Sequence, residues 1–142
     1  MQSGMETLLA ALDQAGFCVE VETNGSIPLA NFRNLGENIC FTMDYKLPSS
    51  GMEDRMCQPN LGHLRAGDAI KFVCGSREDL LRMWEILAMR TVDDAVDVFL
   101  SPAFGQLKAE EIAAFMKERE LTQARLQLQL HKYVWPTETK GV

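Results

Sequence analysis

Short β-branched runs that alternate with segments of helical periodicity restrict the fold of this chain more than any other feature. The runs predict strands at residues 18–23, 39–43, 69–73, 96–100 and 125–130. The periodic segments predict helices at 4–15, near 29–35, at 77–88 and at 107–120. Strands that alternate with helices favour right-handed βαβ units and a parallel sheet. The sequence therefore predicts an α/β fold, a partial (β/α) barrel of about five parallel strands.

The chain has the length of one domain, since 142 residues suit a single core and leave little room for a second. It opens on a helix, with no strand before it to cover the edge of the predicted sheet. We therefore expect residues 1–142 to be one domain, the C-terminal half of a larger barrel. A homodimer, or a separate N-terminal half, is expected to cover the open edge.

Composition argues against several classes of partner. The net charge is −6 and the 14 basic residues are scattered among 20 acidic ones, so no nucleic-acid surface is predicted. No apolar run reaches the roughly 18 residues that span a bilayer, and no signal-peptide pattern is present, which predicts a cytoplasmic protein without membrane contact. The cysteines lack metal-site spacing and are expected to be reduced and mostly buried: Cys18, Cys40, Cys57 and Cys74.

Polar side chains recur on one face of the predicted strands. Because side chains alternate across a strand, Glu20 and Glu22 share the face opposite Val19 and Val21. The same rule adds Asn24, Cys40, Thr42, Asp44, Lys71, Asp97, Ser101, Gln127, Gln129 and His131. A sheet covered by helices on both faces would be almost wholly apolar, so this row predicts a wet or ligand-filled interior. The alternative is an ordinary polar interior, in which Glu20 or Glu22 pairs with Lys71 and the glutamines bond to one another.

Ligands of such folds bind at the carboxyl ends of the strands, which predicts a small-molecule site there. These ends fall at 24, 44–46, 74–76, 101–102 and 131–132. The segment 44–67 exceeds the roughly 12 to 15 residues of ordinary connections and is a candidate binding segment or lid. The sequence contains no nucleotide-binding glycine loop, HExxH or GxSxG motif, and neither histidine has metal-site spacing.

Four segments, taken in order, resemble one known family. They are VETNGSIP at 21–28, TMDYKLPSSGM at 42–52, IKFV at 70–73 and QLQLHK at 127–132. They are similar to the second half of the radical S-adenosylmethionine enzymes of the 7-carboxy-7-deazaguanine synthase family, from about residue 5 to the C-terminus. The resemblance implies a lyase of queuosine biosynthesis that converts 6-carboxy-tetrahydropterin to 7-carboxy-7-deazaguanine. It also implies S-adenosylmethionine, magnesium and a four-iron four-sulfur cluster as cofactors of the complete enzyme.

The resemblance also assigns binding residues. Where many relatives have Ser-Pro-Lys at the cofactor, this chain has residues 44–46, of which only Lys46 matches. Residues 101–102 fall where relatives have a Gln-Pro segment near the same cofactor. The implied S-adenosylmethionine contacts are Asn24, Asp44, Tyr45, Lys46, Ser101 and Pro102. The implied substrate contacts are Gln129, His131 and Pro136.

The sequence departs from the family pattern in the residues that hold the cluster. The CxxxCxxC motif, whose thiolates bind the iron–sulfur cluster, is missing from these 142 residues, as is the Gly-Gly-Glu-Pro segment. Cys18 and Cys40 cannot replace the motif, because they lie on separate predicted strands. We therefore expect no cluster, no metal and no radical reaction from this chain alone, and whether it is an enzyme stays open. The alternative hypothesis is a non-catalytic α/β interaction module that dimerises or binds a partner through its open barrel edge.

Overall fold

Five parallel strands form an open sheet in the computed structural model, which describes residues 4–130 and 134–135. The strands are β1 (Val19–Thr23), β2 (Ile39–Tyr45), β3 (Ala69–Cys74), β4 (Asp97–Pro102) and β5 (Ala124–Leu126). They lie in the order β1-β2-β3-β4-β5, so each strand pairs with its neighbour in the sequence. This consecutive order is that of a section of a (β/α) barrel. In a doubly wound sheet, the order of the strands would instead reverse partway across the sheet. The predicted α/β fold with five parallel strands is confirmed.

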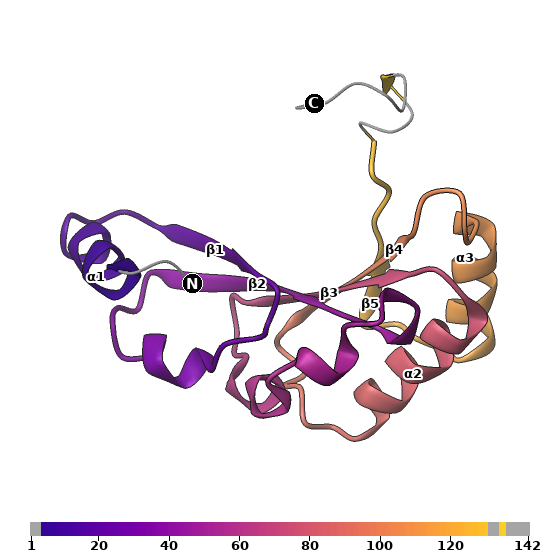
Figure 1. Cartoon of the computed structure of the whole chain (residues 1–142), viewed down its shortest axis with the longest axis horizontal. Helices are drawn as coiled ribbons and strands as arrows, with labels where there is room; N and C mark the ends of the chain where they lie inside the picture. The colour runs from indigo at the N-terminus through magenta and orange to yellow at the C-terminus, as the bar shows by residue number, and fades with distance from the viewer. Residues whose placement is uncertain (1–3, 131–133, 136–142) are drawn as a thin grey trace.

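The α-helices of the described residues pack along the sheet. α1 (Met5–Gln14) lies against β1, α2 (Arg77–Ala88) against β3, and α3 (Ala109–Glu118) against β4 and β5. Ser76 is the N-cap of α2, and its hydroxyl oxygen accepts the backbone N–H of Asp79 at 3.2 Å. Figure 1 shows α1 at one end of the sheet and α3 at the other. None of the helices within 4–130 and 134–135 is long and apolar enough to cross a membrane.

The first two crossovers contain 3₁₀ turns instead of α-helices. Between β1 and β2 lies η1 (Leu29–Phe32), where a short helix near 29–35 was expected. Between β2 and β3 lie η2 (Pro48–Ser50), η3 (Glu53–Arg55) and η4 (Gln58–His63). Prolines and glycines punctuate the second crossover at 48, 51, 59 and 62, so no helix there extends beyond a turn or two.

The two faces of the sheet differ in chemistry. One face is apolar, since the strand pairing sets Phe41 beside Val21 and Phe72 beside both Tyr45 and Leu100. The other face carries the predicted polar row, in which Glu22 lies beside Thr42 and Asp44 beside Lys71. Val73 and Phe99 interrupt this row. The buried residues of the strands all lie on the apolar face except Ser101 and Ala69: Ile39, Phe41, Met43, Tyr45, Ile70, Phe72, Cys74, Val98, Leu100, Pro102 and Ala124.

The alternative of an internally paired polar row is not seen in the described residues. Lys71 forms no ion pair with Glu20 or Glu22 among them. Glu20 instead accepts a hydrogen bond from the Thr42 hydroxyl at 2.6 Å. The side chains of Glu22, Lys71, Gln127 and Gln129 have no hydrogen-bond or ion-pair partner among the described residues, so part of the row keeps its hydrogen-bonding capacity.

The long crossover between β2 and β3 packs into the core. Its apolar side chains, Leu47, Met56, Leu61 and Leu64, are buried. Asn60, which is 0% exposed, accepts the backbone N–H of Leu29 at 2.8 Å and so joins this crossover to the first one. Of residues 44–67, the expected binding segment or lid, the first part lines the cleft at the strand ends with residues 44–47, 49 and 50, while the later part contributes buried side chains to the core.

Candidate functional site

A small cleft lies at the carboxyl edge of the sheet, where β2, β3 and β4 end. Its volume is about 210 Å³, and its lining includes Asp44, Lys46, Ser49, Ser50, Val73 and Gln106. The carboxyl ends of parallel strands meet at one edge, so the end of β2 comes together with the loop after β4. Residues more than fifty positions apart in the sequence thereby share one cleft.

Asp44 and Lys46 give the cleft both signs of charge. Lys46 Nζ lies 2.7 Å from Asp44 Oδ2, and the two side chains are 34% and 37% exposed. An ion pair this exposed contributes about 0–1 kcal/mol, so a ligand can displace it at little cost. The second oxygen, Asp44 Oδ1, is buried and has no hydrogen-bond partner. The cleft therefore offers an ammonium group to an anion, and beside it lies a carboxylate oxygen whose hydrogen-bonding capacity is unused.

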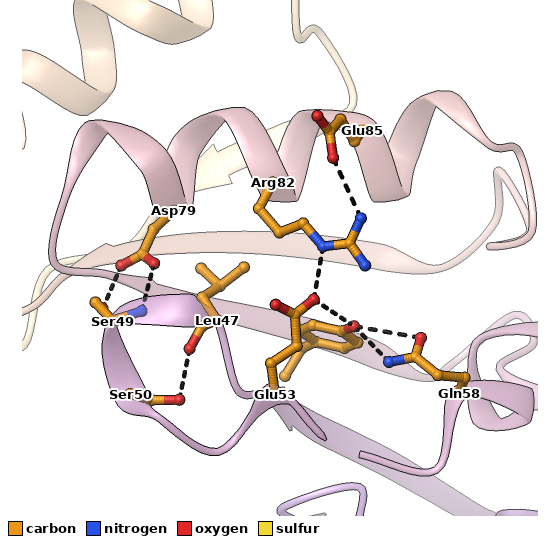
Figure 2. A network of polar contacts seen from close by, with 9 residues as sticks. Leu47, Ser49, Ser50, Glu53, Gln58, Asp79, Arg82 and Glu85 are labelled. Carbon is orange, nitrogen blue, oxygen red and sulfur yellow. Dashed lines mark hydrogen bonds and ion pairs between the residues drawn. The ribbon is translucent and has the colours of Figure 1, made fainter. Parts of the chain in front are cut away.

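Asp79 of α2 fixes the two backbone segments beside the cleft. Its carboxylate accepts the backbone N–H of Ser49 at 2.9 Å, the Ser49 hydroxyl, and the backbone N–H of Gly75 at 2.7 Å. Figure 2 shows Asp79 reaching from the helix to the loop at Ser49. Gly75 leaves room here, since a Cβ atom would lie 2.2 Å from Gln106 Oε1. The loop after β2 and the end of β3 are thus fixed to one buried carboxylate.

Tyr45 points away from the cleft. Side chains alternate along β2, so its ring lies on the apolar face and is 1% exposed. Its hydroxyl donates to Glu53 at 3.3 Å and accepts from Gln58 at 3.0 Å, while Arg82 donates to Glu53 at 2.6 Å (Figure 2). Burial raises the pKa of Tyr45, and the Glu53 bond raises the pKa of Arg82. Tyr45 therefore remains protonated at neutral pH and can offer a ligand only its backbone.

A second hollow adjoins the cleft, between the loop after β4 and the segment after β5. Its volume is about 410 Å³, and its lining includes Pro102, Gly105, Lys108, Glu111 and Gln129. Gln106 lines both hollows. The cleft alone is smaller than the roughly 300–1,000 Å³ of typical small-molecule pockets, whereas the second hollow is within that range. A ligand of nucleoside size would need both.

The predicted site residues divide by location. Asp44 and Lys46 line the cleft with their side chains, and Pro102 and Gln129 line the second hollow. Gln129 Oε1 is buried there without a hydrogen-bond partner. His131 and Pro136 lie outside the described residues.

Asn24 and Ser101 bond within the protein instead of lining either hollow. Asn24 is exposed after β1, at the same edge of the sheet, and its Oδ1 accepts from the backbone N–H and hydroxyl of Ser26 at 3.2 and 2.8 Å. Ser101 is buried, and its hydroxyl donates to the Gln127 carbonyl at 2.8 Å. Neither side chain lines the cleft or the second hollow.

The cysteines do not fit an iron–sulfur cluster. They are free thiols on different elements; Cys18 is exposed, Cys74 is buried, and Cys40 and Cys57 are partly buried, so the expectation of mostly buried thiols holds fully only for Cys74. Burial raises the pKa of Cys74 to about 12 and raises that of Cys40 as well. A cluster needs clustered thiolates, and the described residues include no group of three or more His, Cys, Asp or Glu side chains able to hold a metal.

Three polar residues that line the cleft were missed from the sequence: Ser49, Ser50 and Gln106. They follow the ends of β2 and β4 by several residues, while Gly75, which approaches Gln106, directly follows β3. Gly75 falls within a strand end singled out for ligands, but nothing local in the sequence indicates that Gln106 folds back against it. That contact depends on the path of the loop 103–108, which only the three-dimensional structure gives.

An open parallel sheet in barrel order, with a charged cleft at its carboxyl edge, defines an α/β protein with the site arrangement of small-molecule-binding barrels. Comparison with curated proteins gives its relatives. The 7-carboxy-7-deazaguanine synthase of Clostridium acetobutylicum is 40% identical over 100% of this chain, and that of Chlorobaculum tepidum is 32% identical over 100%. The one from Leptospira interrogans is 37% identical over 81% of the chain. The chain is a homologue of the 7-carboxy-7-deazaguanine synthases along its whole length, which confirms the resemblance.

The chain spans about half to two thirds of the length of these relatives. It covers 65% of the Clostridium protein, 64% of the Chlorobaculum protein and 48% of the Leptospira protein. No protein-family model matches the chain. No solved structure matches it either.

Proposed function

We propose that this chain is the S-adenosylmethionine-binding part of a radical enzyme of the 7-carboxy-7-deazaguanine synthase type. The complete enzyme would convert 6-carboxy-tetrahydropterin to 7-carboxy-7-deazaguanine in queuosine biosynthesis, as a cytoplasmic lyase. The observation that carries the proposal is the position of Asp44 and Lys46. These two residues, assigned to the cofactor by the family resemblance, line a cleft at the carboxyl edge of the sheet.

The donors and acceptors of the cleft fit this ligand. Lys46 would pair with the carboxylate of the methionine part, and Asp44 Oδ1, which is buried without a partner, would accept a hydrogen bond from the ligand. Gln106 would contact the nucleoside part, because its amide lines both hollows. In the complete enzyme the cofactor supplies the carbon–sulfur bond whose cleavage begins the radical reaction. The residues of this chain bind and orient it.

The cluster that cleaves this bond would have to come from residues outside this sequence. The four cysteines do not fit it, and the sequence contains no CxxxCxxC motif. We therefore infer that this chain does not perform the reaction alone. A complementary half would pair with β1, which is an edge of the described sheet. In that assembly the pterin and magnesium would lie near Gln129, with His131 and Pro136 as further contacts.

A second candidate function is that of a non-catalytic interaction module. The open edge at β1 and the poor fit of the cysteines to a cluster favour it. Such a module would use the edge for a partner and would have no need of the cleft. Binding of S-adenosylmethionine therefore separates the two candidates.

Isothermal titration calorimetry with S-adenosylmethionine tests the proposal. We expect the wild-type chain to bind, and Lys46→Ala to weaken binding about tenfold or more, since a hydrogen bond between charged groups contributes roughly 1.5–3 kcal/mol. Gly75→Ala should also weaken binding, because its methyl group would lie 2.2 Å from Gln106 Oε1 and so forces the end of this cleft-lining side chain to move. Gly62→Ala is the matched control: its Cβ atom meets only a backbone oxygen at 4.0 Å.

Two results would count against the proposal. Absence of heat with the wild-type chain, both alone and with the N-terminal part of a relative added, would favour the interaction module. Equal binding by wild type, Lys46→Ala and Gly75→Ala would mean that the ligand binds elsewhere on the protein.

A further inference from the structure

The ammonium group of Lys71 lies on the polar face of the sheet without an ion-pair partner among the described residues. Its neighbour across the β2–β3 ladder is Asp44, but that carboxylate pairs with Lys46 at 2.7 Å. Lys71 is partly buried, so its side chain has lost part of its hydration. An anion at this position would compensate the loss. The polar face therefore offers one unmatched positive charge at the middle of β3.

Phe99 of β4 places an aromatic ring next to this ammonium group. The β3–β4 ladder pairs Lys71 with Phe99, and neighbouring strands lie about 4.8 Å apart, so the two side chains leave the same face side by side. Phe99 is partly exposed there. On its other side, the guanidinium group of Arg125 lies 5.9 Å from the ring centroid and pairs with Asp97 at 2.9 Å. A free cation beside an accessible ring fits a flat heterocycle that carries an anionic group.

This pair of side chains lies next to the cleft at the strand ends. Val73 lines the cleft, and Lys71 precedes it by two residues on the same face of β3, a separation of about 7 Å along the strand. The substrate of a radical reaction must contact the cofactor that supplies the radical. A ligand held by Lys71 and Phe99 would meet this requirement if the cofactor occupies the cleft.

We propose that Lys71 is a specificity-determining residue for the substrate. Its ammonium group binds the carboxylate of the substrate, and the ring of Phe99 supports the heterocycle, which extends toward β5 and Gln129. The inference rests on the proposed function, in which substrate and product both carry a carboxylate on a fused ring system. Lys71 selects the carboxylated heterocycle over the same ring without the carboxylate. Lys46 stays with the cofactor.

Fluorescence titration with 6-carboxypterin, and with pterin, which lacks the carboxylate, tests this assignment at neutral pH. We expect the wild-type chain to bind 6-carboxypterin more tightly. Lys71→Met keeps the length of the side chain but removes its charge, so it should weaken 6-carboxypterin about tenfold or more and leave pterin unchanged. Lys71→Arg should restore the preference, because it restores the charge. Phe99→Leu should weaken both ligands alike, since both rings lose the aromatic contact.

Lys117→Met is the matched control for the loss of a lysine charge. Lys117 is exposed on α3, whose Ile112 and Phe115 pack into the core on the other face of the sheet. This variant should bind both pterins as the wild type does. Lys71→Met should also keep the wild-type affinity for S-adenosylmethionine in calorimetry. Thermal unfolding checks that each variant is folded.

Three results would overturn the assignment. The first is a wild-type chain that binds the two pterins equally, or binds neither, both alone and with the N-terminal part of a relative added. The second is an unchanged preference in Lys71→Met. The third is a Lys71→Met variant that weakens only the association with the N-terminal part, which would make Lys71 a counter-ion for that part.

Calorimetry with S-adenosylmethionine separates this inference from the proposed function. Cofactor binding without a preference for the carboxylated pterin would reject the role of Lys71 alone. Absence of cofactor binding would reject the proposed function itself.

Discussion

Buried polar residues connect the crossovers that have no α-helix. Asn60 donates to the carbonyls of Gly25 and Ile27 at 3.0 and 2.9 Å, which fixes the loop after β1. Asp68 forms an ion pair with Arg33 and accepts the backbone N–H of Phe41 at 2.8 Å. Backbone groups in irregular segments need partners when they are buried. Asn60 and Asp68 supply these hydrogen-bond partners, whereas in an α-helix the backbone groups would bond to one another.

The buried thiol of Cys74 makes the free energy of unfolding change with pH in the alkaline range. Burial raises its pKa from 9.0 to about 12, so between these values the unfolded chain loses the thiol proton while the folded chain keeps it. The folded state then holds more protons, and the free energy of unfolding falls as pH rises, by up to about 1.4 kcal/mol per pH unit. Urea unfolding in reductant, from about pH 8 to about pH 10, measures the slope.

The matched variants for this experiment are Cys74→Ala and Cys57→Ala. Removing the buried thiol should reduce the slope, and the raised pKa values of Cys40 and Tyr45 supply a remainder of the same sign. The small cavity lowers stability at every pH. Removing the partly buried Cys57 should leave the slope as it is in the wild type. Equal slopes for wild type and Cys74→Ala would mean that another group governs the alkaline dependence.

At the scale of elements, the start of α2 fixes one side of the cleft. Ser76 caps this helix, and three residues later Asp79 turns its carboxylate to the loop after β2. Ser76→Ala should lower the free energy of unfolding by about 1 kcal/mol, since the N–H of Asp79 loses its acceptor. Ser76→Asp should restore most of it. Thermal unfolding of the three proteins gives the comparison, and no loss in the alanine variant would show that the cap is not needed.

The sequence predicts those elements whose side chains repeat regularly. α2 was predictable because the capping residue Ser76 precedes an apolar stripe at helical spacing, of which Leu80 is buried in the structure while Leu81 is 37% exposed. The crossover 46–68 was not, because its buried Leu47, Met56 and Leu61 have no common period. Their burial depends on partners from other elements. Such packing cannot be derived from local sequence.

The length of β5 shows a second limit of sequence patterns. Alternation predicts a strand over 125–130, but the paired strand ends at Leu126, with one more backbone bond from Gln127 to Leu100. The next donor in the ladder would be Pro102, which has no N–H. The Ser101 hydroxyl bonds the Gln127 carbonyl instead. A residue on the neighbouring strand therefore decides where β5 ends.

The sequence predicted only those site residues that follow from the regular alternation of side chains along a strand. Alternation along β2 and the rule of strand ends were enough to bring Asp44 and Lys46 to one cleft. Alternation also sends the Tyr45 ring to the other face, which an assignment of the whole tripeptide to the cofactor overlooks. Gln106 and Gln129 reach their hollows through loop paths, and these have no periodic signal.

For the whole molecule, the consecutive strand order predicts a gradient of stability across the sheet. β3 has hydrogen-bonded strands on both sides, whereas β1 and β5 lie at the edges. Amide hydrogen exchange should therefore be slowest in β3, where it requires global unfolding, and fastest among the strands at Leu126, whose N–H points outward. The Glu22 amide should exchange fast as well, because Val19 donates its N–H across to Asn38 and alternation leaves the Glu22 N–H on the open side of β1. A Leu126 amide as slow as those of β3 would contradict both the gradient and the open edge at β5.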